Sequence, residues 1–369
     1  MFLMIFVNDL EPVPGVPEWL KHAGDNADAL GFADTIFPAF LFIMGLSIPF
    51  ALRSRMLRGD SSKKIALHIA SRAFALILMG FFQVNLENYN AGAWLPHSVW
   101  EIGITLSFFA IWLDLPKNIK PKVKILLRAT GIALLILMAL LFKGGTAKDP
   151  QGLDPDWWGI LGLIGWAYLI CAGIFLATAG RLWFQVAAAV FFLLFNIADR
   201  AHLLRPLSDI RDYVWIVGDG AMPALVMGGV VIALLYRNWG VGKTALIGGA
   251  MIGFGFLVRP IRGISKVHNT PSWVALSMGL SILVFCLLVF LVDNRRKQNW
   301  FRLIKPAGTS TLTAYLLPYL LYSVYELCGF HYPAFLNEGA GGLLRSLAVA
   351  FCIVFLTGWM EKKRIRLKI

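Results

Sequence analysis

The chain has 369 residues, of which 58% are hydrophobic and only 15% charged, and its mean hydropathy is +0.69. This composition indicates a polytopic membrane protein, and helices are the expected spanning elements because a backbone in lipid must satisfy its own hydrogen bonds. The net charge of +13 does not indicate nucleic-acid binding, since the charges fall in short loops and almost no soluble surface remains.

Apolar runs of helical length recur along the whole chain and predict about 11 full transmembrane helices after a partial first one. Residues 1–7 are apolar but too few to cross a core of roughly 30 Å, so either this helix is partial or the natural chain begins upstream. The full spans are expected at about 32–52, 65–86, 99–115, 123–142, 158–179, 183–197, 213–236, 244–258, 273–292, 312–327 and 343–360. Without a fixed-period repeat or a low-complexity linker, residues 1–369 are expected to form one all-α membrane domain.

Alternate loops differ in their basic residues, which predicts how the chain is inserted. Of the 34 lysines and arginines, 22 fall in every second loop and the C-terminal tail, and nine fall in the other loops. Cytoplasmic loops carry the excess of positive charge, so the C-terminus is expected inside and His22 and Asp34 outside. The loop 259–268 fits this scheme least, since it is basic on the outer face and follows a glycine-rich span that a re-entrant segment would also explain.

His22 and Asp34 stand at the expected mouth of the second span, where ionisable side chains are costly unless they are paired. A loop histidine is usually just solvated, and Asp34 alone is also explained by helix capping or by the helix dipole. Together the two side chains provide a base that titrates near neutral pH and a group that fixes its tautomer. This pair is therefore the candidate catalytic site.

His68 and Arg72 are four residues apart and share one face of the third span. Arg72 lies about eight residues inside that span, roughly 12 Å at helical rise, which is deep for an unpaired charge. A structural ion pair and an anionic, phosphate-bearing cofactor explain it equally well. Arg128 and Arg345 are close enough to span ends for their charges to reach water.

Several polar residues lie near the expected outer ends of spans. Asn8 follows the first helix and could donate a hydrogen bond into the same mouth, while Glu101, Asp219 and Glu326 could each line an outer pocket or simply end a helix in water. The four cysteines lie in or at the end of apolar spans without the spacing of a zinc site or a disulfide framework, so we expect no metal.

The order of these residues resembles a known family. The stretch 4–8 ending in Asn8, the loop with His22, and the run 33–45 that begins Ala33-Asp34-Thr35-Ile36-Phe37-Pro38 look like the heparan-alpha-glucosaminide N-acetyltransferase family of transmembrane acyltransferases. The stretch 71–80 with Gln83 and Asn85 is similar to the third span of that family. The resemblance is strong through about residue 85 and continues only in hydropathy after it.

Members of that family move an acetyl group from cytosolic acetyl-CoA to the amine of a terminal glucosamine across the membrane. The resemblance implies that His22 is the catalytic histidine, with Asp34 as its acidic partner. It also implies that Asn8 is a polar neighbour in the active site. From their positions in the predicted spans, we further expect Asn8, Asn85 and Glu101 to bind substrate and Arg72 and His68 to bind the donor.

The sequence departs from the family pattern in three places. An opening segment with an aspartate and an arginine–glycine pair is absent, and the loop from His22 to Asp34 is slightly longer than expected. Glu101 stands about where the family commonly has an arginine, which bears on the identity of the acceptor.

We therefore expect a membrane acetyltransferase with acetyl-CoA as donor and an amino sugar or glycan as acceptor. Its surroundings would be the lipid of a bacterial inner membrane, which the compact loops favour over a lysosomal one, and a homodimer is an arrangement the sequence allows. A secondary transporter of a small polar or anionic solute also fits the predicted spans and intramembrane charges. A structural subunit without chemistry is a third reading.

Overall fold

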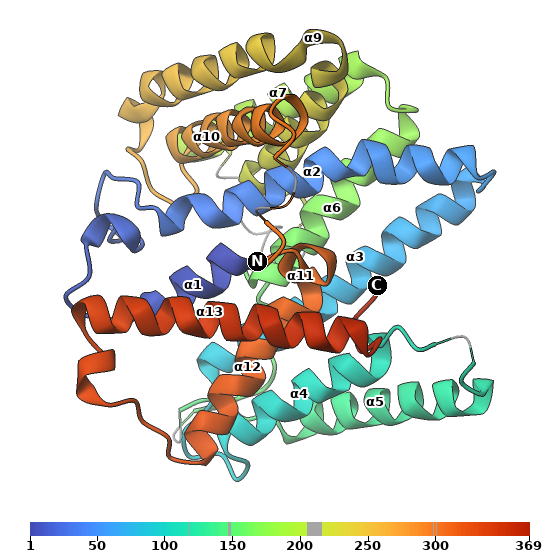
Figure 1. The fold of residues 1–369 in the computed structure, drawn as a ribbon, viewed down its shortest axis with the longest axis vertical. Coiled ribbons are helices and arrows are strands. Elements are labelled where there is room, and N and C mark those ends of the chain that lie inside the picture. Colours follow the sequence, from blue (N-terminus) through green and yellow to red (C-terminus); the bar gives the residue numbers. More distant parts are fainter. Residues whose placement is uncertain (117, 147–148, 205–215, 298, 300) are drawn as a thin grey trace. The chain divides into compact units, whose positions relative to one another are not determined.

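The structure is a computed structural model that describes residues 1–116, 118–146, 149–204, 216–297, 299 and 301–369. The expected all-helical membrane architecture is confirmed, because eight helices among these residues are long and apolar enough to cross a membrane. They are α2 (Ala33–Leu57), α3 (Ser62–Val84), α5 (Pro121–Leu141), α6 (Ile160–Ala177), α7 (Leu182–Arg200), α9 (Ala221–Leu257), α10 (Pro271–Val289) and α13 (Gly339–Lys362), all labelled in Figure 1. A two-residue ribbon of β1 (Gly144–Gly145) and β2 (Pro150–Gln151) is antiparallel.

The count of eleven full spans is not confirmed, although a helix lies at each predicted position. Two of them, α4 (His97–Trp112) and α12 (Thr311–Leu327), have 16 and 17 residues and fall just short of a span's usual length. The predicted end of α4 at Leu115 is wrong, because Leu113 turns to an extended conformation and pairs with Leu367. Asp114 N–H then donates to the Arg366 carbonyl at 2.8 Å.

Helix α9 is a helical hairpin rather than one long rod. Gly240 interrupts it with φ 70° and ψ −176°, a conformation that favours glycine. Gly228 abuts Met278 and Gly255 abuts Leu276, whereas 27 residues of straight helix would separate the two glycines by about 40 Å. The halves therefore fold back along α10 and correspond to the predicted spans 213–236 and 244–258, of which residues 213–215 lie outside the described part.

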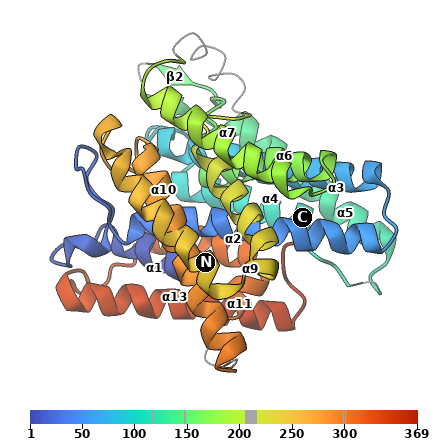
Figure 2. The same ribbon diagram turned by 90° about the horizontal axis from the view of Figure 1, so that it is seen from above.

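The chain falls into two compact units. The second unit comprises Pro17–Ile77 and Ile160–Asn299. In it α9 lies against α2, α7 and α10, and Figure 2 shows α9 and α10 side by side. A Cβ atom on Gly45 would come within 2.0 Å of the Val226 carbonyl oxygen, so α2 and α9 touch backbone to backbone. This close packing holds α2, whose first turn carries the candidate site, against α9.

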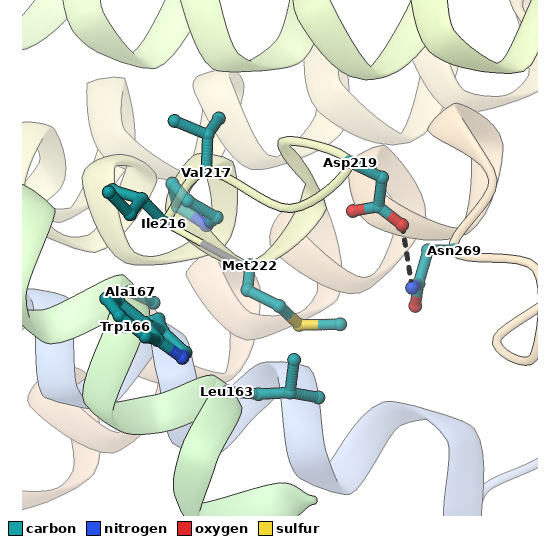
Figure 3. A pocket seen from close by; sticks show the side chains of 9 residues that line it. Leu163, Trp166, Ala167, Ile216, Val217, Asp219, Met222 and Asn269 are labelled. Atoms are coloured by element: carbon teal, nitrogen blue, oxygen red, sulfur yellow. Dashed lines mark hydrogen bonds between the residues drawn. The ribbon is translucent and has the colours of Figure 1, made fainter. Parts of the chain in front are cut away.

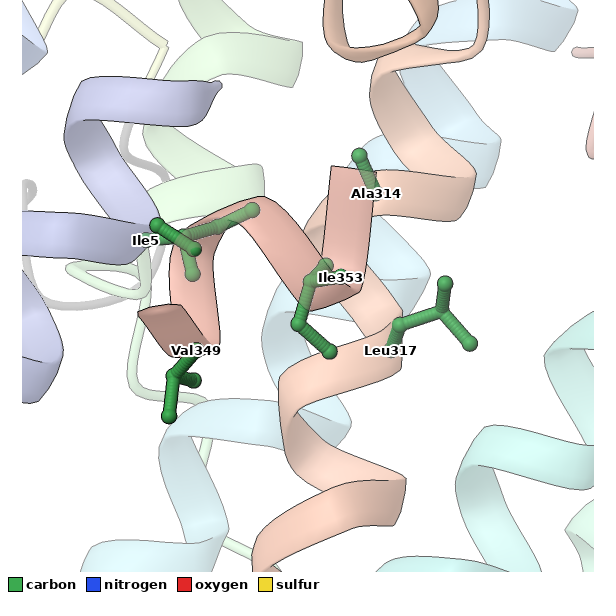
Figure 4. Packing of buried hydrophobic residues seen from close by; sticks show 6 residues of the cluster. Ile5, Ala314, Leu317, Val349 and Ile353 are labelled. Carbon is green, nitrogen blue, oxygen red and sulfur yellow. The ribbon is translucent and has the colours of Figure 1, made fainter. Parts of the chain in front are cut away.

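The first unit comprises Met1–Val16, Leu78–Gly159 and Trp300–Ile369. It contains α1 (Phe2–Leu10), the end of α3, α4, α5, the short α11 (Pro306–Thr309), α12 and α13. Figure 4 shows the apolar cluster in which Ile5 of α1 packs against side chains of α12 and α13. The cluster consists of Ile5, Ala314, Leu317, Val349, Ala350 and Ile353. The expectation of a single membrane domain stays a prediction.

Candidate active site

Asp34, in the first turn of α2, is the fixed point of the candidate site. Its side chain is only 2% exposed. Oxygen Oδ2 accepts hydrogen bonds from the backbone N–H groups of Ala23 and Gly31, each at 3.0 Å. The buried Trp273 indole donates to the Asp34 carbonyl at 3.1 Å. The carboxylate therefore organises the preceding loop instead of capping its own helix.

His22 is held by the other oxygen of the same carboxylate. Its Nδ1 lies 2.7 Å from Asp34 Oδ1, and its side chain is 25% exposed. An ionised carboxylate only accepts hydrogen bonds, which assigns the proton to Nδ1 and leaves the lone pair on Nε2. The structure thus brings the two predicted residues together and gives the imidazole an orientation suited to proton removal.

Gly31 allows the loop to close on Asp34. A Cβ atom at this position would lie 2.0 Å from the Lys21 carbonyl oxygen, so the two backbone segments have to separate to admit it. On the same loop, Gly24 has no atom within 4 Å of such a Cβ. The tight approach at Gly31 therefore sets the position of His22 relative to the carboxylate.

Gly31→Ala should misplace His22, whereas Gly24→Ala should not. We expect the first variant to lose about 1–3 kcal/mol of stability and, if His22 is catalytic, about 100-fold in rate, since a shift of about 1 Å has that effect. Thermal unfolding and the acetylation rate would be measured side by side. Equal behaviour of the two alanine variants would show that the close approach is unimportant.

Lys266 is a third polar group at the His22 ring, and the sequence did not single it out. Its Nζ lies 3.2 Å from both ring nitrogens of His22. It belongs to the basic loop 259–268 that fitted the predicted topology least. The sequence offered one signal, which was the positive charge of loop 259–268 on the same predicted side of the membrane as the acidic loop that carries His22.

Asp28 fastens that basic loop to the loop that carries His22. Its carboxylate accepts from the Ile264 N–H at 2.6 Å and from Arg259 Nε at 2.9 Å. The Ile264 hydrogen bond, followed by the Arg259 contact, lowers the pKa of Asp28 below its ordinary value. The positive charge of the loop is thus paired with acid at the same end of the second unit, which explains why it departs from the charge rule.

The predicted donor residues His68 and Arg72 lie together in the second unit, with Arg55 of α2 as a further member. The charges of Arg55 and Arg72 both act on the His68 ring. Arg72 lies over the Tyr168 ring at 5.2 Å, and within the described ranges no carboxylate approaches it within 4.0 Å. The structural ion pair that would explain Arg72 is therefore not found there. Arg55 contacts Asp60 at 3.3 Å.

Asn8 and Glu101 both line a cavity of about 210 Å³ in the first unit. Its walls also include three tyrosines of α12, and the full lining is Met1, Met4, Ile5, Asn8, Glu101, Tyr315, Pro318, Tyr319 and Tyr322. Glu101 is 8% exposed and accepts a hydrogen bond from the Ser323 hydroxyl. Two of the three predicted substrate-binding residues thus share one cavity.

Asn85, the third predicted substrate-binding residue, uses its side-chain amide in hydrogen bonds within the protein. Its amide donates to the carbonyls of Phe81 and Asp154 at 2.8 and 3.0 Å, and its oxygen accepts from Asp154 N–H at 3.0 Å. These bonds fasten the loop before α6 to the end of α3. Binding of substrate by Asn85 would require them to open.

The two remaining outer acids have other surroundings. Asp219 pairs with Arg200 and lines a cavity of only about 10 Å³. Figure 3 shows its hydrogen bond with Asn269, whose Nδ2 donates at 2.8 Å. That volume holds about one water molecule. Glu326 is 61% exposed and lies 3.8 Å from His97. The cavity beside Asp219 is thus too small for a sugar.

Comparison with known proteins supports the resemblance seen in the sequence. A family model described as "Domain of unknown function (DUF5009)" matches residues 15–203, just over half of the chain. Heparan-alpha-glucosaminide N-acetyltransferase of Homo sapiens is 37% identical over 118 residues, which are 30% of this chain and 17% of that protein. The protein of the same name from Mus musculus is 36% identical over 131 residues, 32% of this chain and 19% of its own length. The matches thus span less than a fifth of these curated relatives.

Proposed function

Because the chain belongs to the DUF5009 family and is similar to heparan-alpha-glucosaminide N-acetyltransferases, we propose that it is a membrane acetyltransferase. Acetyl-CoA is the donor, and an amino sugar or glycan is the acceptor. The observation that carries the proposal is the 2.7 Å hydrogen bond between His22 and the buried Asp34, at the start of a membrane-spanning helix.

His22 acts as the base in this proposal. Its Nε2 removes a proton from the acceptor amine as the nitrogen attacks the thioester carbonyl; the C–N bond forms, the C–S bond breaks, and the CoA thiolate takes up a proton. Asp34 holds the imidazole and stabilises its charged form. Direct transfer and passage through an acetyl-histidine use the same residues. The Lys266 ammonium is close enough to His22 to face the negative charge that develops on the carbonyl oxygen.

Arg72, His68 and Arg55 bind the phosphates of the donor in this proposal. Phosphate recognition favours arginine, whose planar guanidinium donates two parallel hydrogen bonds. Support comes from the absence of a carboxylate within 4.0 Å of Arg72 in the described part of the chain. With the loop 53–64 cytoplasmic, as the charge rule predicts, this cluster receives cytosolic acetyl-CoA while His22 works at the periplasmic side of a bacterial inner membrane.

Binding of acetyl-CoA to the purified chain tests this proposal most directly. At a hundred times the dissociation constant, a ligand that binds only the folded state adds about 2.7 kcal/mol to stability. Acetyl-CoA should therefore raise the unfolding temperature measurably, whereas an equal concentration of adenosine should not. A secondary transporter would show no response to acetyl-CoA but would respond to its own solute, and that result would contradict the proposal.

A further inference from the structure

The Lys266 side chain stands at His22 in the place that the attacking nitrogen of an acceptor would take. Its Nζ lies 3.2 Å from Nε2, and a base removes a proton from a group at about 2.6–3.2 Å. Nδ1 lies at the same distance from Nζ but donates its own proton to Asp34, so Nε2 is the ring atom that accepts from the lysine. The candidate base therefore faces an amine of the chain itself.

The turn that carries Lys266 is fixed by hydrogen bonds on both sides of it. Ser265 N–H donates to Thr270 Oγ1, and Thr270 N–H donates back to the Ser265 carbonyl, both at 3.0 Å. Before them, Ile264 N–H donates to the Asp28 carboxylate at 2.6 Å. The backbone thus holds Lys266 beside the imidazole, while its four-carbon side chain keeps the freedom to turn.

An amine held next to a base, where a thioester is bound, has the position of an acceptor. We propose that the protein acetylates its own Lys266 when no other acceptor is bound, a modification that rests on the proposed function. His22 Nε2 takes a proton from the Lys266 ammonium and passes it to solvent, and the freed nitrogen attacks the thioester carbonyl of acetyl-CoA. The C–N bond forms, the C–S bond breaks, and a second proton from the nitrogen goes to the CoA thiolate.

The product is an amide on the Lys266 side chain. Amides do not pass acetyl groups to amines as thioesters and acetyl-imidazoles do, so the acetyl group stays on the protein. Acetyl-lysine is therefore an end product and not an intermediate in transfer to an acceptor. Acetylation also removes the positive charge of a lysine. The modified protein lacks the ammonium that faces the carbonyl oxygen in the proposed mechanism.

Peptide mass spectrometry of the purified full-length protein, incubated with acetyl-CoA alone, tests this modification. Lys266 should be acetylated at least about 100-fold faster than Lys21, the usual contribution of a general base. Lys21 is the matched control, because it precedes His22 in the chain but has no side-chain hydrogen bond or ion pair with the residues that the structure describes. In His22→Ala the rate at Lys266 should fall to that of Lys21. Equal rates in the parent protein, or an unchanged rate in His22→Ala, would overturn the assignment.

Competition by glucosamine provides a second measurement that needs no variant. Glucosamine in excess, with acetyl-CoA kept saturating, should slow the acetylation of Lys266 and leave Lys21 unaffected, since only Lys266 shares a base with the acceptor. A rate at Lys266 that glucosamine does not lower would place the modification outside the proposed site. If glucosamine is acetylated and Lys266 never is, the self-acetylation is wrong while the proposed function stands. If neither amine is acetylated, the proposed function fails as well.

Discussion

His22→Ala should lower the rate of acetyl transfer by about 100- to 10,000-fold, the usual contribution of a general base. The variant should fold, because the His22 side chain is partly exposed. Its hydrogen bond to Asp34 also lies in the loop before α2 and does not belong to the apolar packing between helices. The measurement is the initial rate with acetyl-CoA and glucosamine, made beside a thermal unfolding curve. A rate near that of the parent protein in a folded variant would remove His22 from the chemistry.

Two further variants sharpen this result. His331→Ala removes a loop histidine whose ring contacts only the Gly329 carbonyl among the described hydrogen bonds, and it should keep full activity. Asp34→Asn places an amide where the carboxylate accepts three N–H groups, so one donor loses its acceptor and the histidine tautomer is no longer fixed. Its rate should fall about as far as that of His22→Ala, and stability should drop by about 1–3 kcal/mol.

Arg72→Gln should weaken the use of acetyl-CoA by about 10- to 150-fold in kcat/KM, which corresponds to about 1.5–3 kcal/mol for a lost charged hydrogen bond. The loss should be confined to donors that carry phosphate. Acetyl-pantetheine has the same thioester without the nucleotide phosphates, and its kcat/KM should be nearly the same in the variant and the parent protein. The comparison of the two donors is thus the measurement that isolates phosphate binding.

Arg128→Gln is the control for that experiment. Arg128 also lies within a span, but it is exposed on α5 and does not stack on a tyrosine as Arg72 does. It should leave both donors unaffected. If Arg72→Gln slowed acetyl-CoA and acetyl-pantetheine equally, Arg72 would have a structural role and the donor would bind elsewhere.

The helices were largely predictable from hydropathy, because the pattern of apolar runs follows directly from burial in lipid. The predictions that failed concern helix ends that depend on contacts with residues far away in the sequence. Leu113 does not continue the helix but pairs with Leu367, some 250 residues away. No local sequence pattern predicts such a partner. The reversal at Gly240 was predicted as a loop between two spans, but its tightness depends on one left-handed glycine.

The site residues likewise fall into those that the sequence predicts and those that only the folded chain brings together. His22 and Asp34 were predictable because they are close in sequence and chemically complementary, and the structure places them in contact. Lys266 comes from a loop 244 residues later, so only the folded chain brings it to the imidazole. Asn85 was predicted to bind substrate from its position in the sequence, but in the folded chain its side chain makes hydrogen bonds with the protein backbone.

Asp34 holds two backbone N–H groups of its loop as well as the imidazole, whereas the His22 ring contacts the side chains of Asp34 and Lys266. Selection for folding alone would therefore retain the acid after the chemistry had decayed, because leaving those buried donors unsatisfied destabilises the native state. The imidazole has no such protection. In a related chain that has become inactive, the aspartate should be retained longer than the histidine. The presence of the histidine should therefore distinguish active relatives from inactive ones.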